Sequence, residues 1–551
     1  MPADVEFLLA NWNRMVAARR QNWETEWIVI GDMCAPRKLG ALTGAAPGQK
    51  MTSGRFTALG EESAILLSNY IHGNLTNPAL RWQSLRMRKE ELNRLNHVQN
   101  WLDHGSVEFS QSLNASNFET QIVEHFYDAA VFGTSVTLKL PRAITPPGEF
   151  GGWLFHTLQI GTYVISDDKE GRTDTVYRSF QKTVRAAHQQ WGEAIGKEWI
   201  EVMRGEGGKE RKPEEMMEII HAIYPRTDLK AVGSRKKTMP WASVYFDPKH
   251  KRILEEGGYV RFPGLVTRWT KNGDEVWGRG PAHTASPELN TLNRVRELEL
   301  AGWALDIAPA TFEQEGAIVG GLDWTPAARN IVRGEKGSVW TLPSGTRYDI
   351  STIKKEELKR DIERAFFVDQ IRALPPADKP SYMTAFEVAK RYEETFRLLG
   401  TAFGHMKFGM LQPLVEGGIS DLYEQRILDP IPPEMEGEDI DIEYEGPLAR
   451  AQKASDLQSL DLETAWVLQV QPLMPEIMDN LNWDKVAQHR ARVRGIPASL
   501  MNGEDEVAAI REERAEQERQ MAELQKGMAL AEAAGKAAPM VRELKPEQGA
   551  A

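Results

Sequence analysis

Two stretches of the sequence have residue types that could carry chemistry. The first, Gly44 to Thr52, combines glycines, Lys50 and a hydroxyl group, as a phosphate-binding loop does. In such a loop Ser or Thr directly follows the lysine, so that both side chains reach the phosphate and its metal ion. Here Met51 follows Lys50, and no strong strand precedes the stretch. We therefore expect an exposed loop here and not a nucleotide site.

The second stretch is the acidic pair Asp167 and Asp168, which could bind a metal ion or act as an acid and a base. The pair begins a turn-like segment that ends at Gly171, and aspartates in such turns are usually solvated. Three histidines nearby lack the spacing of a zinc motif: His188, His221 and His250. The sequence thus predicts no catalytic residue, no cofactor and no metal site.

Composition limits the class of protein. The chain has 551 residues, 41% of them apolar and 26% charged, enough for two to four domains. Its one cysteine, Cys34, excludes an intramolecular disulfide and an all-cysteine metal site and suits a reducing compartment. No apolar run is long enough to span a membrane, and Met1 to Asp4 does not resemble a signal peptide. We expect assembly in the cytoplasm.

The net charge of −12 argues against a general electrostatic grip on nucleic acid, because such binding depends on cationic patches that displace counterions from phosphates.

The first 285 residues have the pattern of an α+β body. Helical spacing of apolar residues predicts helices at residues 5–30, 60–77, 90–110, 117–132 and 184–195. Alternation of β-forming residues predicts strands at 135–140, 153–158, 163–166, 173–180, 219–225, 241–246 and 259–269.

A new helix is expected to open at Ser286, with Ser286 as N-cap, Pro287 at the first helical position and Glu288 in the first turn. It runs toward Ala308. A compact glycine-rich module follows, from Ala310 to Ser351, with strand-like pieces at residues 317–319 and 338–342.

A helix, a proline turn and a second helix follow this module. The first helix, Leu358 to Leu374, is expected to stop at Pro375-Pro376. After a polar loop the second begins with a capping box formed by Thr384 and Glu387. It continues to Leu414 and is expected to end at Gly417-Gly418. Considered alone, the pair most simply packs inside a large domain.

The C-terminal part is expected to be helical after an extended segment. Like charges from Glu434 to Glu445 should repel and extend that segment. Helices are expected at residues 448–473 and 483–494. A third, from Glu504 to about Ala534, has a narrow apolar stripe and should need neighbours. Ala537 to Ala551 is expected to be disordered.

Several separated motifs, taken in order, resemble those of the portal (head-to-tail connecting) proteins of short-tailed bacteriophages. They are Asn22-Trp23 to Pro36, Gly73 to Pro78 with Arg81 to Leu85, Phe132 to Thr134, Gly278 to Ala282, Met383 to Val388 and Gly446 to Ala451. The most specific is Met-Thr-Ala-x-Glu-Val, in which Phe386 replaces a small polar residue while the cap residues are kept. The resemblance covers roughly residues 5 to 530 and is weakest from Arg204 to Lys237 and in the tail.

The resemblance implies a mainly helical α+β portal fold that assembles into a ring, usually of about twelve subunits. It divides the chain into a wing (1–285), stem helices (286–309 and 353–374), a clip (310–352), a tunnel loop (375–383), a long wing helix with a linker (384–447) and a helical crown with a disordered tail (448–551).

The same resemblance implies a non-enzymatic role in the virion, at a capsid vertex, as the channel for DNA packaging and ejection. Its partners would be double-stranded DNA, terminase, major capsid and scaffold proteins and tail adaptor proteins, with no membrane. The tunnel-loop candidates are Arg372, Pro375, Pro376, Asp378, Lys379, Ser381 and Tyr382. Of these, Arg372 and Lys379 could contact phosphate or be ordinary solvated or intersubunit charges. Another structural virion protein, such as a scaffold or minor head protein, and a nucleotide-dependent enzyme stay as alternatives.

Overall fold

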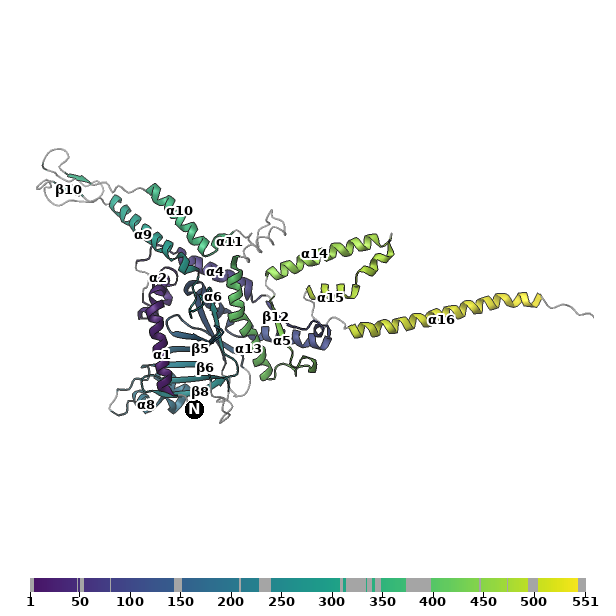
Figure 1. Ribbon diagram of the computed structural model, residues 1–551, viewed down its shortest axis with the longest axis horizontal. Coiled ribbons are helices and arrows are strands. Elements are labelled where there is room, and N and C mark those ends of the chain that lie inside the picture. Colours follow the sequence, from purple (N-terminus) through teal and green to yellow (C-terminus); the bar gives the residue numbers. More distant parts are fainter. Residues whose placement is uncertain are drawn as a thin grey trace, which may run out of the picture. The chain divides into compact units, whose positions relative to one another are not determined.

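The computed structural model (Figure 1) describes residues 4–46, 48–49, 54–79, 81–142, 151–207, 210–226, 239–307, 311–313, 333, 339–341, 348–372, 398–444, 447–472, 474–493 and 504–543. The chain is mainly helical with several antiparallel sheets. It divides into two compact units. The first comprises residues 1–82, 109–425 and 446–448, and the second comprises 83–108, 426–445 and 449–551.

The first unit contains most of the regular structure. Its helices are α1 (Val5–Arg19), α2 (Thr25–Cys34), α3 (Gly40–Thr43), α4 (Leu59–Leu75), α6 (Phe118–Phe132), α7 (Val184–Trp191), α8 (Lys197–Arg204), α9 (Pro281–Ile307), α10 (Tyr348–Ala365), α11 (Val368–Arg372) and α13 (Gln412–Glu424). Its strands are β2 (Thr134–Pro141), β3 (Trp153–Thr157), β4 (Tyr163–Asp167), β5 (Thr173–Thr183), β6 (Met216–Pro225), β7 (Trp241–Asp247), β8 (Arg252–Tyr259), β9 (Gly264–Arg268), β10 (Thr311–Glu313) and β11 (Val339–Thr341).

The second unit contains α15 (Trp483–Val493), α16 (Glu504–Glu543) and a two-stranded sheet of β1 (Gln83–Met87) and β12 (Ile440–Tyr444). Two helices have residues in both units, α5 (Asn96–Asn114) and α14 (Pro447–Val470).

The first unit contains a five-stranded antiparallel sheet of order β4-β5-β6-β7-β8. Successive side chains of a strand point to opposite faces, so Ile219 and Ile220 of β6 belong to different cores. Ile220 packs in a cluster with Leu8 and Val16 of α1, which lies beside the strands in Figure 1. Ile219 packs with residues of α7 and α8, including Trp199. The sheet is therefore covered by helices on both faces.

A second sheet has three strands in the order β3-β2-β9. The helical segment that ends in α13 packs against its strand β9. Residues 398–406 are helical, Lys407–Leu411 is π-helical and α13 continues to Glu424. The predicted stop at Gly417-Gly418 is wrong, because these glycines serve packing. A Cβ at Gly418 would lie 2.3 Å from the Phe109 ring, closer than atoms can approach.

Most predicted elements of the α+β body are confirmed, and the differences have local causes. The expected helix at residues 5–30 extends to Cys34, with a π-helical segment at Arg20–Glu24. Four elements of this body were not predicted: α3, α8, β1 and β8. Of the strand-like pieces expected between Ala310 and Ser351, residues 339–341 form β11, which pairs with β10, whereas 317–319 lie outside the described residues.

The first helix of the predicted pair is broken, contrary to expectation. Instead of one helix from Leu358 to Leu374, α10 ends at Ala365 and α11 begins at Val368. Between them Phe367 has a positive φ of 58°, which ends a right-handed helix. The break lets Phe366 and Val368 both become fully buried.

The acidic segment before the C-terminal helices is also different from the prediction. Asp439 and Asp441 flank the Arg88 guanidinium, which is 3.0 Å from Asp441, and Lys89 lies 2.6 Å from Glu438. Basic residues at the end of β1 therefore offset the repulsion, and residues 440–444 form strand β12. Helices α14 and α15 are confirmed. The expected disorder from Ala537 is wrong as far as Glu543, where α16 ends.

Candidate functional site

The start of α9 is fixed by close contacts between two glycine motifs that are far apart in the sequence. Gly133, after α6, has φ 74°, and a Cβ there would lie 2.3 Å from the Gly278 carbonyl oxygen. The Gly278 amide donates to Thr134 Oγ1 at 2.7 Å. A Cβ at Gly280 would meet the Ala130 carbonyl oxygen at 2.5 Å. The backbone leading into α9 thus lies directly against the end of α6, which only glycine permits.

Aromatic side chains surround the same point. Trp277 lies edge-on to Trp27, with ring centroids 4.8 Å apart, and 5.5 Å from the Tyr163 ring. The Arg279 guanidinium lies 4.7 Å from the centre of the Trp23 ring. Three motifs recognised separately in the sequence, at residues 22–36, 132–134 and 278–282, therefore meet in space and anchor the first turn of α9.

The predicted N-terminus of α9 is six residues too late. The helix begins at Pro281, so Pro281 and not Pro287 occupies the first position, and Pro287 lies inside the helix. The Gly280 amide donates to His283 Nδ1 at 3.1 Å, the contact that Glu or Gln makes in a capping box. Burial, with the nearby Arg279 charge, lowers the pKa of His283 to about 4, which keeps Nδ1 free to accept.

Helices α9 and α10 lie side by side in Figure 1 and pack along part of their length. On α9, Leu289 and Leu292 are buried, and on α10 Ile362 is buried. Between the helices Lys355 Nζ lies 2.7 Å from Glu299 Oε1, and both side chains are largely buried. A buried ion pair constrains register, since displacing either partner would leave an unpaired charge.

The second half of α9 leaves apolar side chains in solvent. Leu298 is 55% exposed, Trp303 46% and Ile307 85%, and on α10 Ile353 is 70% exposed. Scattered exposed apolar residues are ordinary on a monomer. Here Trp303 and Ile307 share a face of α9, whereas Leu298 points to the opposite side, so apolar side chains are exposed on two sides of this part of the helix. We call these four residues the stem apolar surface.

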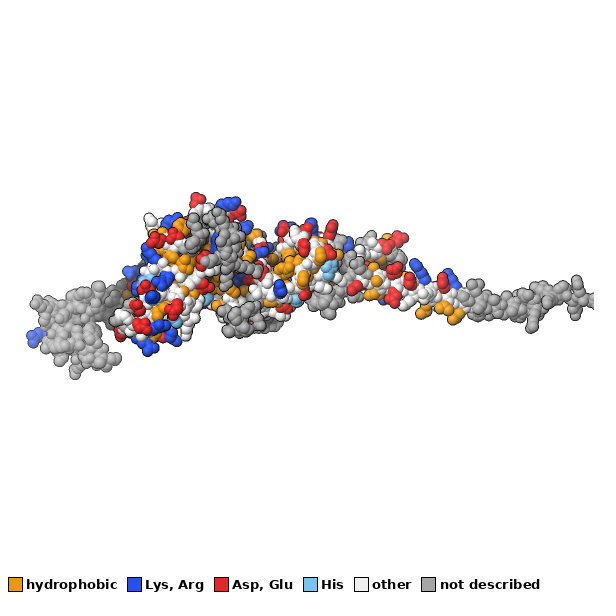
Figure 2. Space-filling view, turned by 90° about the horizontal axis from the view of Figure 1, so that it is seen from below, with side chains coloured by type: hydrophobic (Ala, Val, Ile, Leu, Met, Phe, Trp, Pro, Cys, Tyr) orange, Lys and Arg blue, Asp and Glu red, His pale blue; other side chains and the backbone are white. Residues whose placement is uncertain are grey.

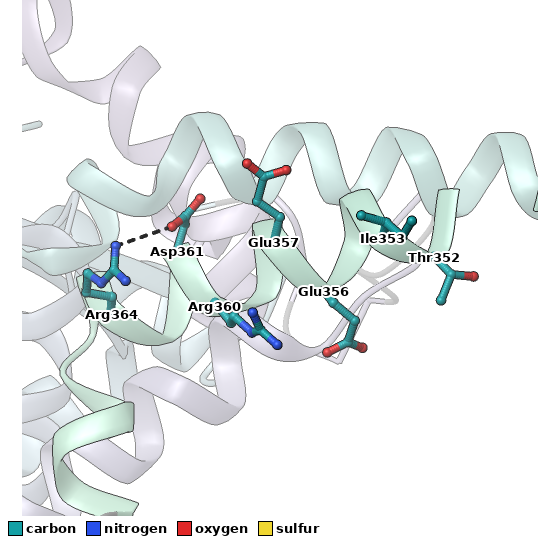
Figure 3. A pocket seen from close by; sticks show the side chains of 7 residues that line it. All are labelled: Thr352, Ile353, Glu356, Glu357, Arg360, Asp361 and Arg364. Atoms are coloured by element: carbon teal, nitrogen blue, oxygen red, sulfur yellow. Dashed lines mark ion pairs between the residues drawn. The ribbon is translucent and has the colours of Figure 1, made fainter. Parts of the chain in front are cut away.

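A surface groove of about 530 Å³ lies along α10. Figure 3 shows its lining, in which Glu357 and Asp361 point to one side and Glu356 and Arg360 to the other. Arg364 Nη1 lies 3.6 Å from Asp361 Oδ1. Apart from Ile353, the lining is charged or polar, with both signs present.

Charges on these two helices form pairs within a helix. Lys354 lies 2.7 Å from Glu357, and Arg294 lies 2.6 Å from Glu297. Figure 2 likewise shows acidic and basic side chains interspersed on the face it presents. Such pairs leave little net positive field, so the described part of α9 and α10 is not built to grip phosphates.

Most of the predicted tunnel-loop and cap residues lie outside the described residues: Pro375, Pro376, Asp378, Lys379, Ser381, Tyr382, Thr384 and Glu387. Arg372 is described and is exposed, and its Nη1 donates to Glu363 Oε1 of α10 at 2.6 Å. This pair gives the Arg372 charge a partner within the chain. Its contact with phosphate stays a prediction.

The residues first considered for chemistry have structural contacts. Asp167 is not the solvated turn residue that was expected, because it is largely buried and pairs with Arg268 and, at 2.6 Å, with Lys271. Asp168 caps the turn by accepting from the Glu170 and Arg172 amides. In the Gly44 to Thr52 stretch, Gly44 ends α3 with φ 69°.

The described ranges contain no group of three His, Cys, Asp or Glu side chains placed to hold a metal ion. No helix among them is long and apolar enough to cross a membrane. Burial raises the pKa of the Cys34 thiol to about 12, so the thiol stays protonated and is a poor nucleophile.

The core next to the anchor contains buried titratable groups that sequence patterns could not identify. The two ring nitrogens of His125 each lie 2.8 Å from a hydroxyl, of Thr137 and of Thr267. Burial, with the Lys38 charge, lowers the pKa of His125 to about 3, so the ring is neutral. Burial raises the pKa of Asp128 to about 6 although Lys38 lies 2.6 Å away.

Comparison with known proteins gives a consistent set of similarities. The model of the family "Bacteriophage head to tail connecting protein" matches residues 8–501. The "Probable portal protein" of Bordetella phage BPP-1 is 28% identical over 526 residues, covering 93% of this chain and 91% of that relative. The "Portal protein" of Salmonella phage epsilon15 is 24% identical over 537 residues, covering 95% and 93%.

Among solved structures, a chain of "Neck of empty GTA particle computed with C6 symmetry" is similar over 77% of this chain and 94% of that one, at 12% identity and a TM-score of 0.33. A likeness at this score supports no conclusion about the fold.

Proposed function

Since this chain belongs to the bacteriophage head to tail connecting protein family, we propose that copies of it form a ring at one capsid vertex, through which DNA is packaged and ejected. In this role the chain is a structural component of the virion, with the wing, stem, clip, tunnel-loop and crown ranges given above. It assembles in the host cytoplasm, docks terminase and tail adaptor proteins, and contacts capsid and scaffold proteins.

The observation that supports ring assembly is the stem apolar surface. Leu298, Trp303, Ile307 and Ile353 have large exposed fractions in the single chain. A repeated contact between the surface of one copy and a different surface of the next closes into a ring when the rotation permits. Burying apolar area contributes about 25 cal/mol per Å², so covering this surface favours assembly.

The charge pattern favours a channel for DNA and argues against a protein that binds DNA tightly. A channel needs low affinity for the duplex that moves through it, and the net charge of −12 opposes adhesion of phosphates to its walls. The pairing of Lys354 with Glu357 and of Arg294 with Glu297 removes local positive field from α9 and α10. The chain therefore holds a path open while a separate ATPase supplies the work.

The tunnel loop is tested by deleting residues 377–381. Rings should still form, measured by sedimentation velocity, while packaging or retention of DNA in assembled heads should fail. A deletion of equal length in the C-terminal tail, residues 547–551, is the control and should leave packaging intact. Normal packaging by the loop deletion would contradict the assignment of the loop.

Two alternatives have their own outcomes. A scaffold or minor head protein would assemble without a central channel. A nucleotide-dependent enzyme would show ATP hydrolysis by the purified chain, and hydrolysis abolished by K50A would favour it.

A further inference from the structure

One face of the five-stranded sheet carries a row of basic side chains beside aromatic rings. Side chains alternate between the two faces of a sheet along a strand. Arg178 and Lys182 are four positions apart on β5, so they point to the same face. The Arg178 guanidinium lies 5.1 Å from the centre of the Phe180 ring. Lys182 Nζ lies 5.2 Å from the centre of the Trp191 ring. Trp191 in turn lies 5.7 Å from the Tyr245 ring.

A buried histidine holds Arg178 in place. Arg178 Nε donates to His221 Nδ1 at 3.2 Å, so the His221 proton is on Nε2, which lies 2.9 Å from Ser243 Oγ. The His221 ring stacks on Tyr245, with centroids 3.9 Å apart and planes 6° apart. The Arg178 side chain is therefore held by His221 and also hydrogen-bonds Tyr245, and the rest of its five N–H groups stay uncommitted by these two contacts.

The two cations of this row have no ion-pair partner among the described residues, although the acidic residue Glu255 lies nearby. Within the described ranges neither Arg178 nor Lys182 forms an ion pair, and the polar contacts of Lys182 are with Gln190. The pKa of Lys182 is lowered by partial burial and by Arg178. The pKa of His156, on β3, is lowered by partial burial and by both Arg178 and Lys182. The charges of Arg178 and Lys182 thus act on His156, whose lowered pKa favours its neutral form.

The nearby acid, Glu255, accepts a hydrogen bond from Trp191 Nε1 at 3.0 Å and forms no ion pair with Arg178 or Lys182. Partly buried cations are normally paired, because an unpaired charge loses hydration without compensation. In a chain whose net charge is −12, a local excess of positive charge on a supported Arg indicates a site for an anion that is not part of this chain.

We propose that Arg178 and Lys182 bind the carboxylates of an acidic peptide segment of a partner protein. The guanidinium fork of arginine matches a carboxylate in two parallel hydrogen bonds. The rings of Phe180, Trp191 and Tyr245 beside the cations suit the apolar side chains that flank carboxylates in a peptide. A nucleic acid is the weaker match, because its binding needs many phosphate contacts along a basic surface.

The test uses the purified full-length chain and fluorescein-labelled hexaglutamate, with binding followed by fluorescence anisotropy at low ionic strength. Hexaglutamate should bind and should be released by salt. The double variant R178Q/K182Q should bind at least about tenfold more weakly. The double variant R185Q/R204Q makes the same change in net charge at exposed, paired arginines of α7 and α8 and should bind like the wild type.

The single variant K182Q guards against loss of folding, since it leaves the Arg178–His221 contact intact. It should fold and lose about threefold in affinity. Equal affinity of R178Q/K182Q and wild type would overturn the proposal, as would an equal loss in R185Q/R204Q. Binding of a labelled single-stranded DNA 12-mer at this cluster, with no binding of hexaglutamate, would overturn the choice of a peptide.

Discussion

The two halves of α9 differ in what their side chains contact. In the first half Ala282, Ala285 and Leu289 are at most 1% exposed, and the entering backbone lies against α6. In the second half Leu298 is 55% exposed and Ile307 is 85% exposed. One helix therefore begins in a complete core and ends with apolar side chains in solvent.

This difference separates what the single chain needs from what the assembly needs. The anchored half packs against other parts of the same chain, so its substitutions should act on the stability of the monomer. The exposed half gains its contacts from another copy in the proposed ring, so its substitutions should act on assembly. Variants at matched positions can test that division.

The largest effect is expected at the anchor. G133A adds a Cβ at a positive φ and within 2.3 Å of the Gly278 carbonyl oxygen, so it should lower the free energy of unfolding by roughly 4 kcal/mol. In the control G273A no atom lies within 4 Å of the added Cβ, so the free energy of unfolding should change little. Urea denaturation measures both variants. Similar midpoints for the two would contradict a close-packed anchor.

The next comparison uses the same change in both halves of α9. L289A removes a fully buried side chain and should cost about 3 kcal/mol in unfolding free energy while leaving the exposed surface unchanged. L298A removes a side chain that is 55% exposed, so it should leave monomer stability within about 0.5 kcal/mol.

Ring assembly, unlike monomer stability, should be reduced by L298A. Sedimentation velocity should show fewer rings for L298A than for the wild type at equal concentration. If L298A assembles normally, the stem apolar surface is not the ring contact.

A smaller effect, dependent on pH, should come from the anchored body. His125 and His283 have pKa values lowered to about 3 and about 4 by burial, whereas the unfolded chain titrates near 6.5. The unfolded state then binds more protons below that value, so their stabilisation is present above pH 6.5 and is lost as pH falls toward the folded values. At pH 5 each of these two histidines contributes on the order of 2 kcal/mol less to the free energy of unfolding than at neutral pH.

Asp128 opposes this trend, because its pKa is raised to about 6 and its folded form takes up a proton as pH falls. The variant H125Q removes one titrating group and should show a shallower fall in the urea midpoint between pH 7 and pH 5. Parallel curves for wild type and H125Q would contradict a neutral, buried His125.

Local sequence patterns predicted most elements of the α+β body and the existence of α9 and α10. They failed where a distant contact decides the outcome. Gly417-Gly418 looks like a helix end, but the glycines make room for Phe109 and for Lys139, whose Nζ would lie 3.0 Å from a Cβ at Gly417. Nothing near Gly418 in the sequence reveals that contact.

The candidate site shows the same division. The glycine and tryptophan motifs were recognised from the sequence one by one, but their meeting at the start of α9 depends on the tertiary fold. The acidic residues near Asp439 were expected to repel, and their basic partner, Arg88, directly follows β1, a strand that sequence patterns missed. The exposure of Leu298 and Ile307 could not be predicted, because apolar residues recur in both halves of α9.

The central claim, that the exposed half of α9 is covered by assembly into a channel, is tested most directly by cryo-electron microscopy of the purified chain. The account predicts rings with an axial hole wide enough for duplex DNA, in which Leu298 and Ile307 contact a neighbouring copy. A compact monomer that persists at high concentration, or rings that leave these two side chains in solvent, would contradict it.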